Sequence, residues 1–182
     1  MEENAKPSRV EHTRGVVETA EELAAKYGAD PAKARLAAWV HDIGKNLPLD
    51  VLDGYVDEYD LGERLLGNPN LSHSKVAEII AKRDFGIDDR DVLNAIAYHT
   101  TGREGMSLLE KIVFLADAIE PGRDHPGVEE VRDLAWIDLD RACLRVLDST
   151  IEYVESRGLE LDRDSIKARD WFRKTVEQKT VK

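Results

Sequence analysis

Apolar residues recur at every third or fourth position along most of the chain, which is the spacing of one face of an α-helix. No stretch shows the strict alternation of apolar and polar positions that predicts a half-buried strand. There is also no internal repeat or low-complexity segment. The pattern therefore predicts an all-helical fold. The expected helices cover residues 8–28, 31 to about 45, 48–59, 72–85, 88–99, 107–119, 139–156 and 164–176.

Residues that commonly start and stop helices support these boundaries. Residues 8–11 (Ser-Arg-Val-Glu) have the form of a capping box, and Asp30 followed by Pro31 is typical of a helix start. Ser107 is expected to open the strongly apolar helix, and Gly86 is expected to end the helix before it. The predicted irregular segments are residues 62–70 and 122–127, with a frayed tail at 177–182.

Length and composition describe one ordinary globular domain. The chain has 182 residues, of which 42% are hydrophobic and 35% are charged. We expect a single domain over residues 1–182 with its core at about 9–172. The net charge of −11 argues against a nucleic-acid-binding surface. The sequence has a single cysteine, Cys143, and it shows neither an apolar run of transmembrane length nor a signal-peptide core. We therefore expect a cytoplasmic protein without a nucleic-acid or membrane partner.

Four of the five histidines form an ordered set with two aspartates. Histidine nitrogens and carboxylate oxygens are common ligands of catalytic transition metals, and helical bundles build such sites from facing helices. One aspartate can also offer its two oxygens to two metals. The set therefore predicts a metal-assisted hydrolase site inside a bundle. Its members are His12, His41, Asp42, His73, His99 and Asp117.

Each member of the set also has a simpler interpretation. His12 suits a surface or hydrogen-bonded core histidine, Asp42 suits a salt bridge to Lys45, and the remaining histidines suit helix ends. Asp117 is the hardest to explain in this way, because it follows the apolar run 112–116. A carboxylate buried in such surroundings needs a metal or an arginine partner.

The order His, His-Asp, His, His and distal Asp is carried by five stretches of the chain. An isolated His-Asp pair is weak evidence of relationship, whereas the two longest strings are much more specific. The stretches are 9–12 (Arg-Val-Glu-His), 41–45 (His-Asp-Ile-Gly-Lys), 71–73 (Leu-Ser-His), 95–102 (Ala-Ile-Ala-Tyr-His-Thr-Thr-Gly) and 115–123 (Leu-Ala-Asp-Ala-Ile-Glu-Pro-Gly-Arg).

On these residues the chain resembles the HD-domain metal-dependent phosphohydrolases from about Arg9 to Phe172. More narrowly, it is similar to the YqeK group, described as symmetrical bis(5'-nucleosyl)-tetraphosphatases. The resemblance implies an all-α HD-domain helical bundle with a dinuclear metal centre. Similar proteins are associated with iron, and manganese, cobalt or zinc also suit such ligands. By position, one metal would be held by His12, His41, Asp42 and Asp117, and Asp42 would bridge to a second metal held by His73 and His99.

The resemblance also implies residues that contact phosphate. Lys45 and Arg123 are the cationic candidates, and Thr100, Thr101 and Gly102 offer hydroxyl and backbone donors. Lys45 equally suits a solvated lysine at a helix end, and Arg123 a surface salt bridge. The three residues after His99 could instead only stop a helix.

Three further interpretations concern residues outside this set. Arg103 is a weaker phosphate candidate. His125 matches no ligand position of the family and is interpreted as a surface loop residue. Cys143 and Trp136 are expected in or near the core.

The function implied is hydrolysis of diadenosine tetraphosphate, or a related dinucleoside polyphosphate, into two nucleoside diphosphates. Two cations that bind the phosphoryl oxygens would activate a water for in-line attack. The alternatives are a nucleotide phosphatase or phosphodiesterase of another specificity, an HD-type di-iron oxygenase, and a non-catalytic nucleotide-binding module. The complete ligand set argues against the last of these, and a homodimer is left open.

Overall fold

A computed structural model describes residues 7–180 of the chain. This part holds nine α-helices, one 3-10 helix and no strand, which confirms the all-helical prediction. Residues 1–6 of the N-terminal stretch and residues 181–182 of the predicted frayed tail lie outside the described residues. The elements are α1 (Pro7–Tyr27), α2 (Pro31–Val40), α3 (Leu49–Glu58), η2 (Glu63–Leu65), α4 (Pro69–Phe85), α5 (Arg90–Tyr98), α6 (Leu108–Ile119), α7 (Val128–Ala135), α8 (Leu139–Ser156) and α9 (Arg163–Thr180).

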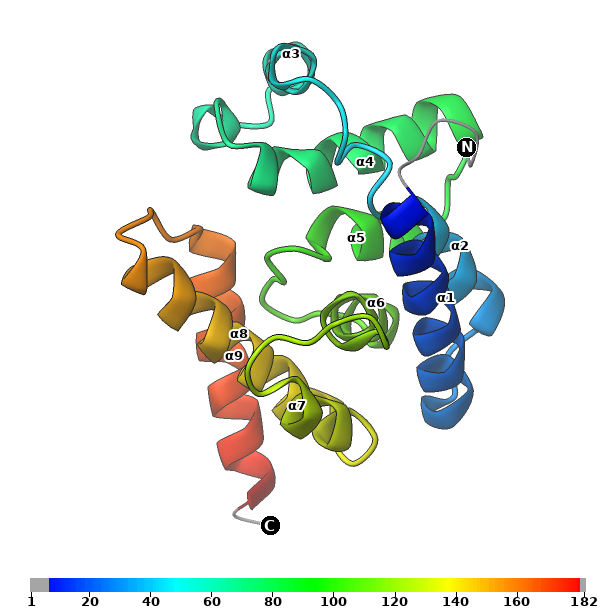
Figure 1. Ribbon diagram of the computed structural model, residues 1–182, viewed down its shortest axis with the longest axis vertical. Coiled ribbons are helices and arrows are strands. Elements are labelled where there is room, and N and C mark those ends of the chain that lie inside the picture. Colours follow the sequence, from blue (N-terminus) through cyan, green and yellow to red (C-terminus); the bar gives the residue numbers. More distant parts are fainter. Residues whose placement is uncertain (1–6, 181–182) are drawn as a thin grey trace.

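Helix α6 is the central element of the fold (Figure 1). It packs against α1, α2, α5, α7 and α8, so its apolar residues are covered on several sides. Ser107 starts it through a capping box, in which the Ser107 hydroxyl accepts the Glu110 N–H and the Glu110 carboxylate accepts the Ser107 N–H. Two hydrogen bonds from Arg103 neutralise the buried Glu110 carboxylate. This arrangement carries Asp117, near the end of α6, into the interior.

Several predicted helix boundaries are confirmed by their caps. The Asp30 carboxylate accepts the Ala32 N–H at 2.8 Å at the start of α2, and the Asp89 carboxylate accepts the Asp91 N–H at 3.0 Å at the start of α5. Gly86 ends α4 in the left-handed conformation, with φ of 64°. These short polar and glycine residues are reliable signals because they satisfy backbone groups that a helix end leaves unpaired.

Two boundaries in the N-terminal half differ from the prediction. Helix α1 begins at Pro7, so Ser8 lies inside the helix and the predicted capping box there is wrong. Helix α2 ends at Val40 rather than near residue 45. The residues His41 and Asp42 therefore lie in the turn that follows α2, and His41 keeps a helical backbone conformation with φ of −53° and ψ of −39°.

Further differences lie later in the chain. The predicted loop 62–70 contains η2 and the first turn of α4, which begins at Pro69 because proline lacks only an N–H that a first turn does not use. Helix α7 was not predicted; it is short and follows Gly127 without a side-chain cap. Helix α9 continues to Thr180 instead of fraying from residue 177, and Lys179 forms an ion pair with Asp140 of α8 at 2.6 Å.

Burial separates the two expected core residues. Cys143 is fully buried, as predicted, but Trp136 is 39% exposed, and its placement in or near the core is wrong. It lies at the end of α7, where the chain turns toward α8. His125 is exposed, as predicted for a loop residue.

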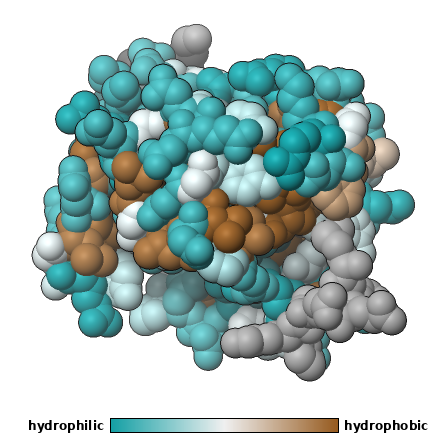
Figure 2. Space-filling model, turned by 90° about the horizontal axis from the view of Figure 1, so that it is seen from above, coloured by the Kyte–Doolittle hydropathy of each residue, from teal (hydrophilic) through white to brown (hydrophobic). Residues whose placement is uncertain are grey.

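Helix α3 lies at one end of the molecule and packs on α4 (Figure 1). Figure 2 looks down on this end and shows an apolar band bordered by polar side chains. The exposed large apolar side chains near α3 include Leu49, Val51, Tyr59 and Leu66.

Helices α7, α8 and α9 pack in sequence onto the α6 side of the bundle. The single domain over residues 1–182 stays a prediction. Among residues 7–180, no helix has both the length and the apolar character needed to cross a membrane.

Candidate metal centre

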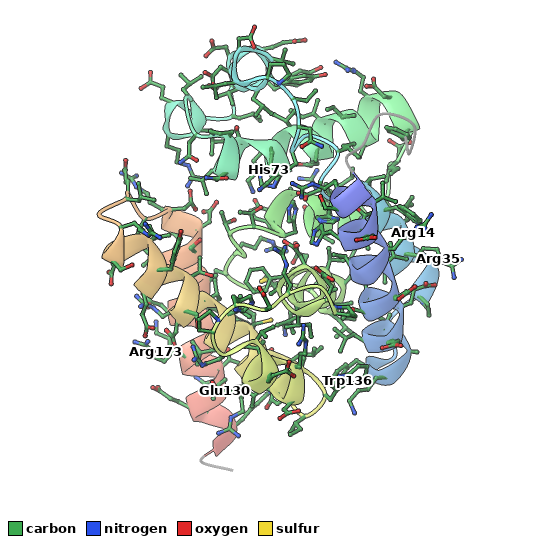
Figure 3. The ribbon with its side chains drawn as sticks, in the orientation of Figure 1. Arg14, Arg35, His73, Glu130, Trp136 and Arg173 are labelled. Atoms are coloured by element: carbon green, nitrogen blue, oxygen red, sulfur yellow. The ribbon has the colours of Figure 1, made fainter. Side chains whose placement is uncertain are left out.

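The structure brings the six predicted ligand residues together at the centre of the bundle. They come from α1, the turn after α2, the first half of α4, the end of α5, and α6. Figure 3 shows His73 on the inner side of α4, whereas Arg35 and Arg173 lie at the periphery. Within each of three overlapping groups, the possible ligand atoms all lie within 4.8 Å of one another. The groups are His12, His41 and Asp42; His41, His99 and Asp117; and Asp42, His73 and His99.

The carboxylate of Asp42 lies between two pairs of imidazoles. Its Oδ1 is 3.3 Å from His73 Nε2 and 3.4 Å from His99 Nε2. Its Oδ2 is 3.7 Å from His41 Nε2 and 3.9 Å from His12 Nε2. Each oxygen therefore faces a different pair, which is the geometry that a carboxylate bridging two metals requires.

Asp117 completes the group on the Oδ2 side. Its Oδ1 lies 3.2 Å from His12 Nε2 and 4.0 Å from His41 Nε2. One side of the centre thus has two imidazoles and two carboxylates. The other has the imidazoles of His73 and His99, whose Nε2 atoms are 3.2 Å apart, and the second oxygen of Asp42.

Backbone carbonyls orient three of the four imidazoles. His41 Nδ1 donates to the Ala38 carbonyl at 2.6 Å, His73 Nδ1 to that of Pro69 at 2.9 Å, and His99 Nδ1 to that of Ile96 at 2.7 Å. A carbonyl can only accept, so these bonds fix the proton on Nδ1. The lone pair of each Nε2 then faces the centre, as in metal-binding histidines.

The fourth imidazole is held by a carboxylate that the sequence interpretation missed. His12 Nδ1 lies 3.1 Å from Oε1 of Glu120, whose residue is only 4% exposed. The other oxygen, Oε2, accepts the Gly122 N–H at 2.6 Å. Gly15 makes room for this carboxylate, because a Cβ there would lie 2.7 Å from Glu120 Oε2. Glu120 therefore orients His12 from behind.

Gly44 sets how closely the His41–Asp42 turn approaches α4. A Cβ at this position would lie 2.6 Å from the His73 carbonyl oxygen, which is backbone and cannot swing aside. Glycine is thus required by close approach rather than by its backbone angles. The contact holds the turn that carries Asp42 directly against the helix that carries His73.

Burial and charge shift the pKa values of the central groups. Burial would raise the pKa of Asp42, but the neighbouring His73 and His99 imidazoles hold it well below its ordinary value. Burial acts in the same way on Asp117, and His12 and other charged neighbours again hold its pKa low. Burial lowers the pKa of His41 to about 4, with His99 adding to the effect. The centre therefore consists of ionised carboxylates and at least one firmly neutral imidazole.

These residues fit divalent metal ions. The Nε2 atoms of His12 and His41 are buried, and neither has a hydrogen-bond partner among the described residues. Buried polar atoms without partners are uncommon and point to a ligand. Nitrogen donors with oriented lone pairs, together with two ionised carboxylates, are the donor set that such metals use.

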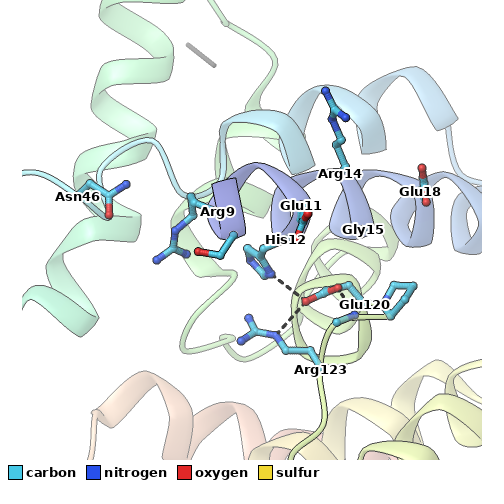
Figure 4. Close-up of a pocket in the computed structure, with 12 residues that line it drawn as sticks. Arg9, Glu11, His12, Arg14, Gly15, Glu18, Asn46, Glu120 and Arg123 are labelled. Carbon is cyan, nitrogen blue, oxygen red and sulfur yellow. Dashed lines mark hydrogen bonds and ion pairs between the residues drawn. The ribbon is translucent and has the colours of Figure 1, made fainter. Parts of the chain in front are cut away.

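Two arginines beside the centre, Arg9 and Arg123, line a pocket of about 690 Å³ together with His12 and Glu120 (Figure 4). Arg123 Nη2 lies 2.5 Å from Asp117 Oδ1, and Arg9 Nη1 lies 2.6 Å from Asp42 Oδ2. The arginine partner considered for Asp117 is thus present, whereas Asp42 pairs with Arg9 and not with Lys45. Arg9 was not recognised from sequence as a site residue, because nothing in its spacing points to the distant Asp42.

The other candidates for phosphate binding differ in how close they lie to the centre. Lys45 Nζ lies 3.5 Å and Thr100 Oγ1 lies 3.3 Å from His73 Nε2, so both reach the centre. Thr101 is buried and donates to the Gly102 carbonyl. A Cβ at Gly102 would meet side chains of α8, α9 and the segment before α6, so this residue faces away from the centre. Of the three residues after His99, the first, Thr100, borders the candidate ligands.

Comparison with known families agrees with this geometry. The HD-domain family matches residues 9–122, which span all six candidate ligands and Glu120. The chain belongs to the HD-domain family. The matched residues lie in helices α1 to α6 and the turn after α6, and helices α7 to α9 follow the matched region.

Individual proteins within the family are similar to this chain over most of their length. The chain is 40% identical over 162 residues to a protein of Bacillus subtilis, covering 88% of this chain and 87% of that protein. It is 36% identical over 167 residues to one of Staphylococcus aureus, covering 90% and 86%. Both relatives are named symmetrical bis(5'-nucleosyl)-tetraphosphatase. A crystal structure from Clostridium acetobutylicum, described as a predicted HD superfamily hydrolase involved in NAD metabolism, superposes with a TM-score of 0.91 at 43% identity and covers 95% of this chain and 93% of that one.

Proposed function

We propose that this protein is a metal-dependent hydrolase that splits diadenosine tetraphosphate, or a related dinucleoside polyphosphate, symmetrically into two nucleoside diphosphates. The observation that carries the proposal is the Asp42 carboxylate, whose two oxygens face two separate imidazole pairs. Relatives that align with most of the chain are named for this activity. A site with two metal positions suits a substrate made of linked phosphates.

The ligand roles in this proposal follow the geometry. Two bound divalent ions would supply Lewis-acid activation of a phosphoryl group and of an attacking water. We propose iron first, because of the resemblance to iron-associated HD proteins, although manganese, cobalt or zinc also suit these donors. His12, His41, Asp42 and Asp117 would hold one ion, and His73, His99 and the second oxygen of Asp42 the other.

The cationic side chains would bind the polyphosphate. Arg9 and Arg123 line the pocket, where their guanidinium groups would pair with phosphate oxygens. Lys45 lies on the His73 side of the centre. Burial lowers the pKa of Lys45, and the nearby carboxylates of Asp42 and Asp117 partly offset this shift. Thr100 adds a hydroxyl donor, while Thr101 and Gly102 shape the turn that presents it. Positive groups on both sides of the centre would neutralise charge that moves onto the bridging oxygen during cleavage.

The metal content tests the dinuclear arrangement. Protein purified without a chelator should contain about two metal ions per chain, because the six donors form two groups that share Asp42. Elemental analysis of the purified protein gives the number and the identity together. The assignment would be contradicted by a fully active protein that contains a single ion and that keeps its activity when His73 or His99 is substituted.

The product pattern tests the reaction. Diadenosine tetraphosphate should yield ADP as the only nucleotide product, since attack next to the central bridging oxygen gives two identical halves. Chromatography of the reaction mixture at several times separates the alternatives. Equal amounts of ATP and AMP would show asymmetric cleavage, and an unchanged substrate would favour a phosphatase of another specificity.

Replacing Arg123 tests the phosphate role. Arg123→Ala should raise KM by about 10- to 100-fold, the range expected for losing a charged hydrogen bond, and should keep the metal. His125→Ala provides the control, because His125 is an exposed residue of the same loop that contacts only backbone carbonyls. Steady-state kinetics and metal analysis of both variants decide the question. Loss of metal with an unchanged KM would make Arg123 a support for Asp117 instead.

One alternative function shares the same ligands. An HD-type di-iron oxygenase needs oxygen, so turnover of dinucleoside tetraphosphate under anaerobic conditions separates it from the hydrolase. The homodimer, the cytoplasmic location and the single domain over residues 1–182 stay predictions beside this proposal. Gel filtration with light scattering measures the first of them.

A further inference from the structure

Helix α7 sends one arginine to the turn that follows α6. We propose that Arg132 is a positioning residue for the reaction, which holds residues 119–123 so that Glu120 and Arg123 face the metal centre. The inference rests on the proposed function for its kinetic consequences but not for its structural ones. Arg132 itself is neither a candidate ligand nor part of the pocket wall.

The guanidinium of Arg132 binds three backbone carbonyls of this turn. Its Nε donates to the Ile119 carbonyl at 2.9 Å, and its Nη2 donates to the carbonyls of Glu120 at 2.9 Å and Arg123 at 2.7 Å. The last carbonyls of a helix have no partner within the helix, and one of these three belongs to the final residue of α6. The planar guanidinium presents its N–H groups in fixed directions, and here it serves these three carbonyls and the Glu129 carboxylate at once.

The same turn carries two groups that face the centre. Glu120 contacts His12 Nδ1 at 3.1 Å (Figure 4). Arg123 Nη2 contacts Asp117 Oδ1 at 2.5 Å. The turn closes with a hydrogen bond from the Arg123 N–H to the Glu120 carbonyl at 2.9 Å. Arg132 binds that same carbonyl, so it supports the bond that sets the relative position of the two side chains.

Other contacts fix α7, and with it Arg132. Glu129, one turn earlier in α7, forms an ion pair with Arg132 NH1. Tyr27 of α1 donates to the Ala135 carbonyl at 2.8 Å, and Arg145 of α8 pairs with Glu130 at 3.0 Å. Helix α7 is thus tied to α1 and α8, and Arg132 transmits this fixed position to the turn.

The test compares Arg132→Met and Arg132→Lys with Arg145→Met. The methionine keeps an apolar stem that ends near the position of Nε and removes all three hydrogen bonds, and the lysine keeps the charge on a single ammonium group without the guanidinium fork. Arg145→Met is the matched control, because it loosens α7 through Glu130 without touching the turn. For each protein we would measure metal content, hydrogen exchange of residues 119–124, affinity for inorganic pyrophosphate by calorimetry, and KM and kcat with diadenosine tetraphosphate.

We expect Arg132→Met to speed exchange in the turn by about tenfold and to weaken pyrophosphate binding and raise KM by about tenfold, with a smaller change in kcat and with the metal retained. Arg132→Lys should fall between wild type and methionine, and Arg145→Met should resemble wild type. Adding Arg123→Ala to Arg132→Met should cost much less than Arg123→Ala alone, because the arginine would already be misplaced.

Two results would overturn the inference. One is fully additive effects of Arg132→Met and Arg123→Ala; the other is an unchanged exchange rate in the turn. If Arg132→Met does not fold, the lysine variant and the exchange data still decide. Exchange and pyrophosphate affinity require no turnover, so a wild-type protein that cleaves no dinucleoside polyphosphate would refute the proposed function and leave this test intact.

Discussion

Replacing Asp42 by alanine is expected to abolish hydrolysis and to remove metal from the protein. The two oxygens of this carboxylate face different imidazole pairs, so the variant loses a ligand from both metal positions at once. The position between His73 and His99 would retain only two nitrogen ligands. Loss of even an indirect metal partner reaches about 100-fold in affinity or activity, and the loss of a shared ligand should exceed that. Metal analysis and turnover of diadenosine tetraphosphate measure both effects.

Asp140 provides the matched control for this substitution. Its side chain is 10% exposed, close to the 9% of Asp42, and it also forms short ion pairs, with Lys111 and Lys179. Asp140→Ala should lower thermal stability and leave metal content and kcat unchanged, since α8 does not contribute to the centre. An Asp42→Ala protein that kept two metals and measurable turnover would disprove the bridging role.

Lowering the pH is expected to destabilise the metal-free protein between about pH 6.5 and pH 4. Burial, assisted by His99, lowers the pKa of the fully buried His41 to about 4, whereas histidine in an unfolded chain titrates near 6.5. Between these values the unfolded state binds a proton that the folded state does not. The free energy of unfolding therefore falls as the pH drops, by about 3 kcal/mol from this group.

Neighbouring groups modify this pH dependence in known directions. Burial also lowers the pKa of His73, which adds to the loss. For His12, burial is outweighed by Asp117 and Glu120, so its pKa is raised; its stabilisation is gained as the pH falls through that raised pKa and stays constant below about pH 6.5. Urea unfolding at several pH values, with chelator present, should show a flatter profile for His41→Gln and a wild-type profile for His125→Gln. Parallel profiles for His41→Gln and wild type would refute the assignment.

The helices could be predicted where local chemistry decides their ends. Asp30, Asp89 and Ser107 cap helices through side-chain oxygens, and each boundary was correct to about one residue. The turn after Val40 could not be predicted, because apolar spacing continues past it while the backbone leaves the helix. Helix α7 was missed because it is short and starts at Gly127 without a capping side chain. Its position depends on contacts with α1 and α8 that lie far away in sequence.

The site shows the same division between local and distant information. Six candidate ligands could be singled out because of their order along the chain, and because Asp117 after its apolar run has few other uses. Arg9 and Glu120 did not stand out, since charged residues on a helix face or in a turn usually face solvent. Their roles depend on Asp42 and His12, which lie 33 and 108 residues away. Only the fold brings these partners together.

The contact at Gly44 bears on how freely this sequence can be altered. The gap between the two halves of the centre is limited where one stretch of main chain touches another, at Gly44 and the His73 carbonyl. Gly44→Ala would place a methyl group 2.6 Å from the His73 carbonyl oxygen, so the two halves of the centre would have to move apart.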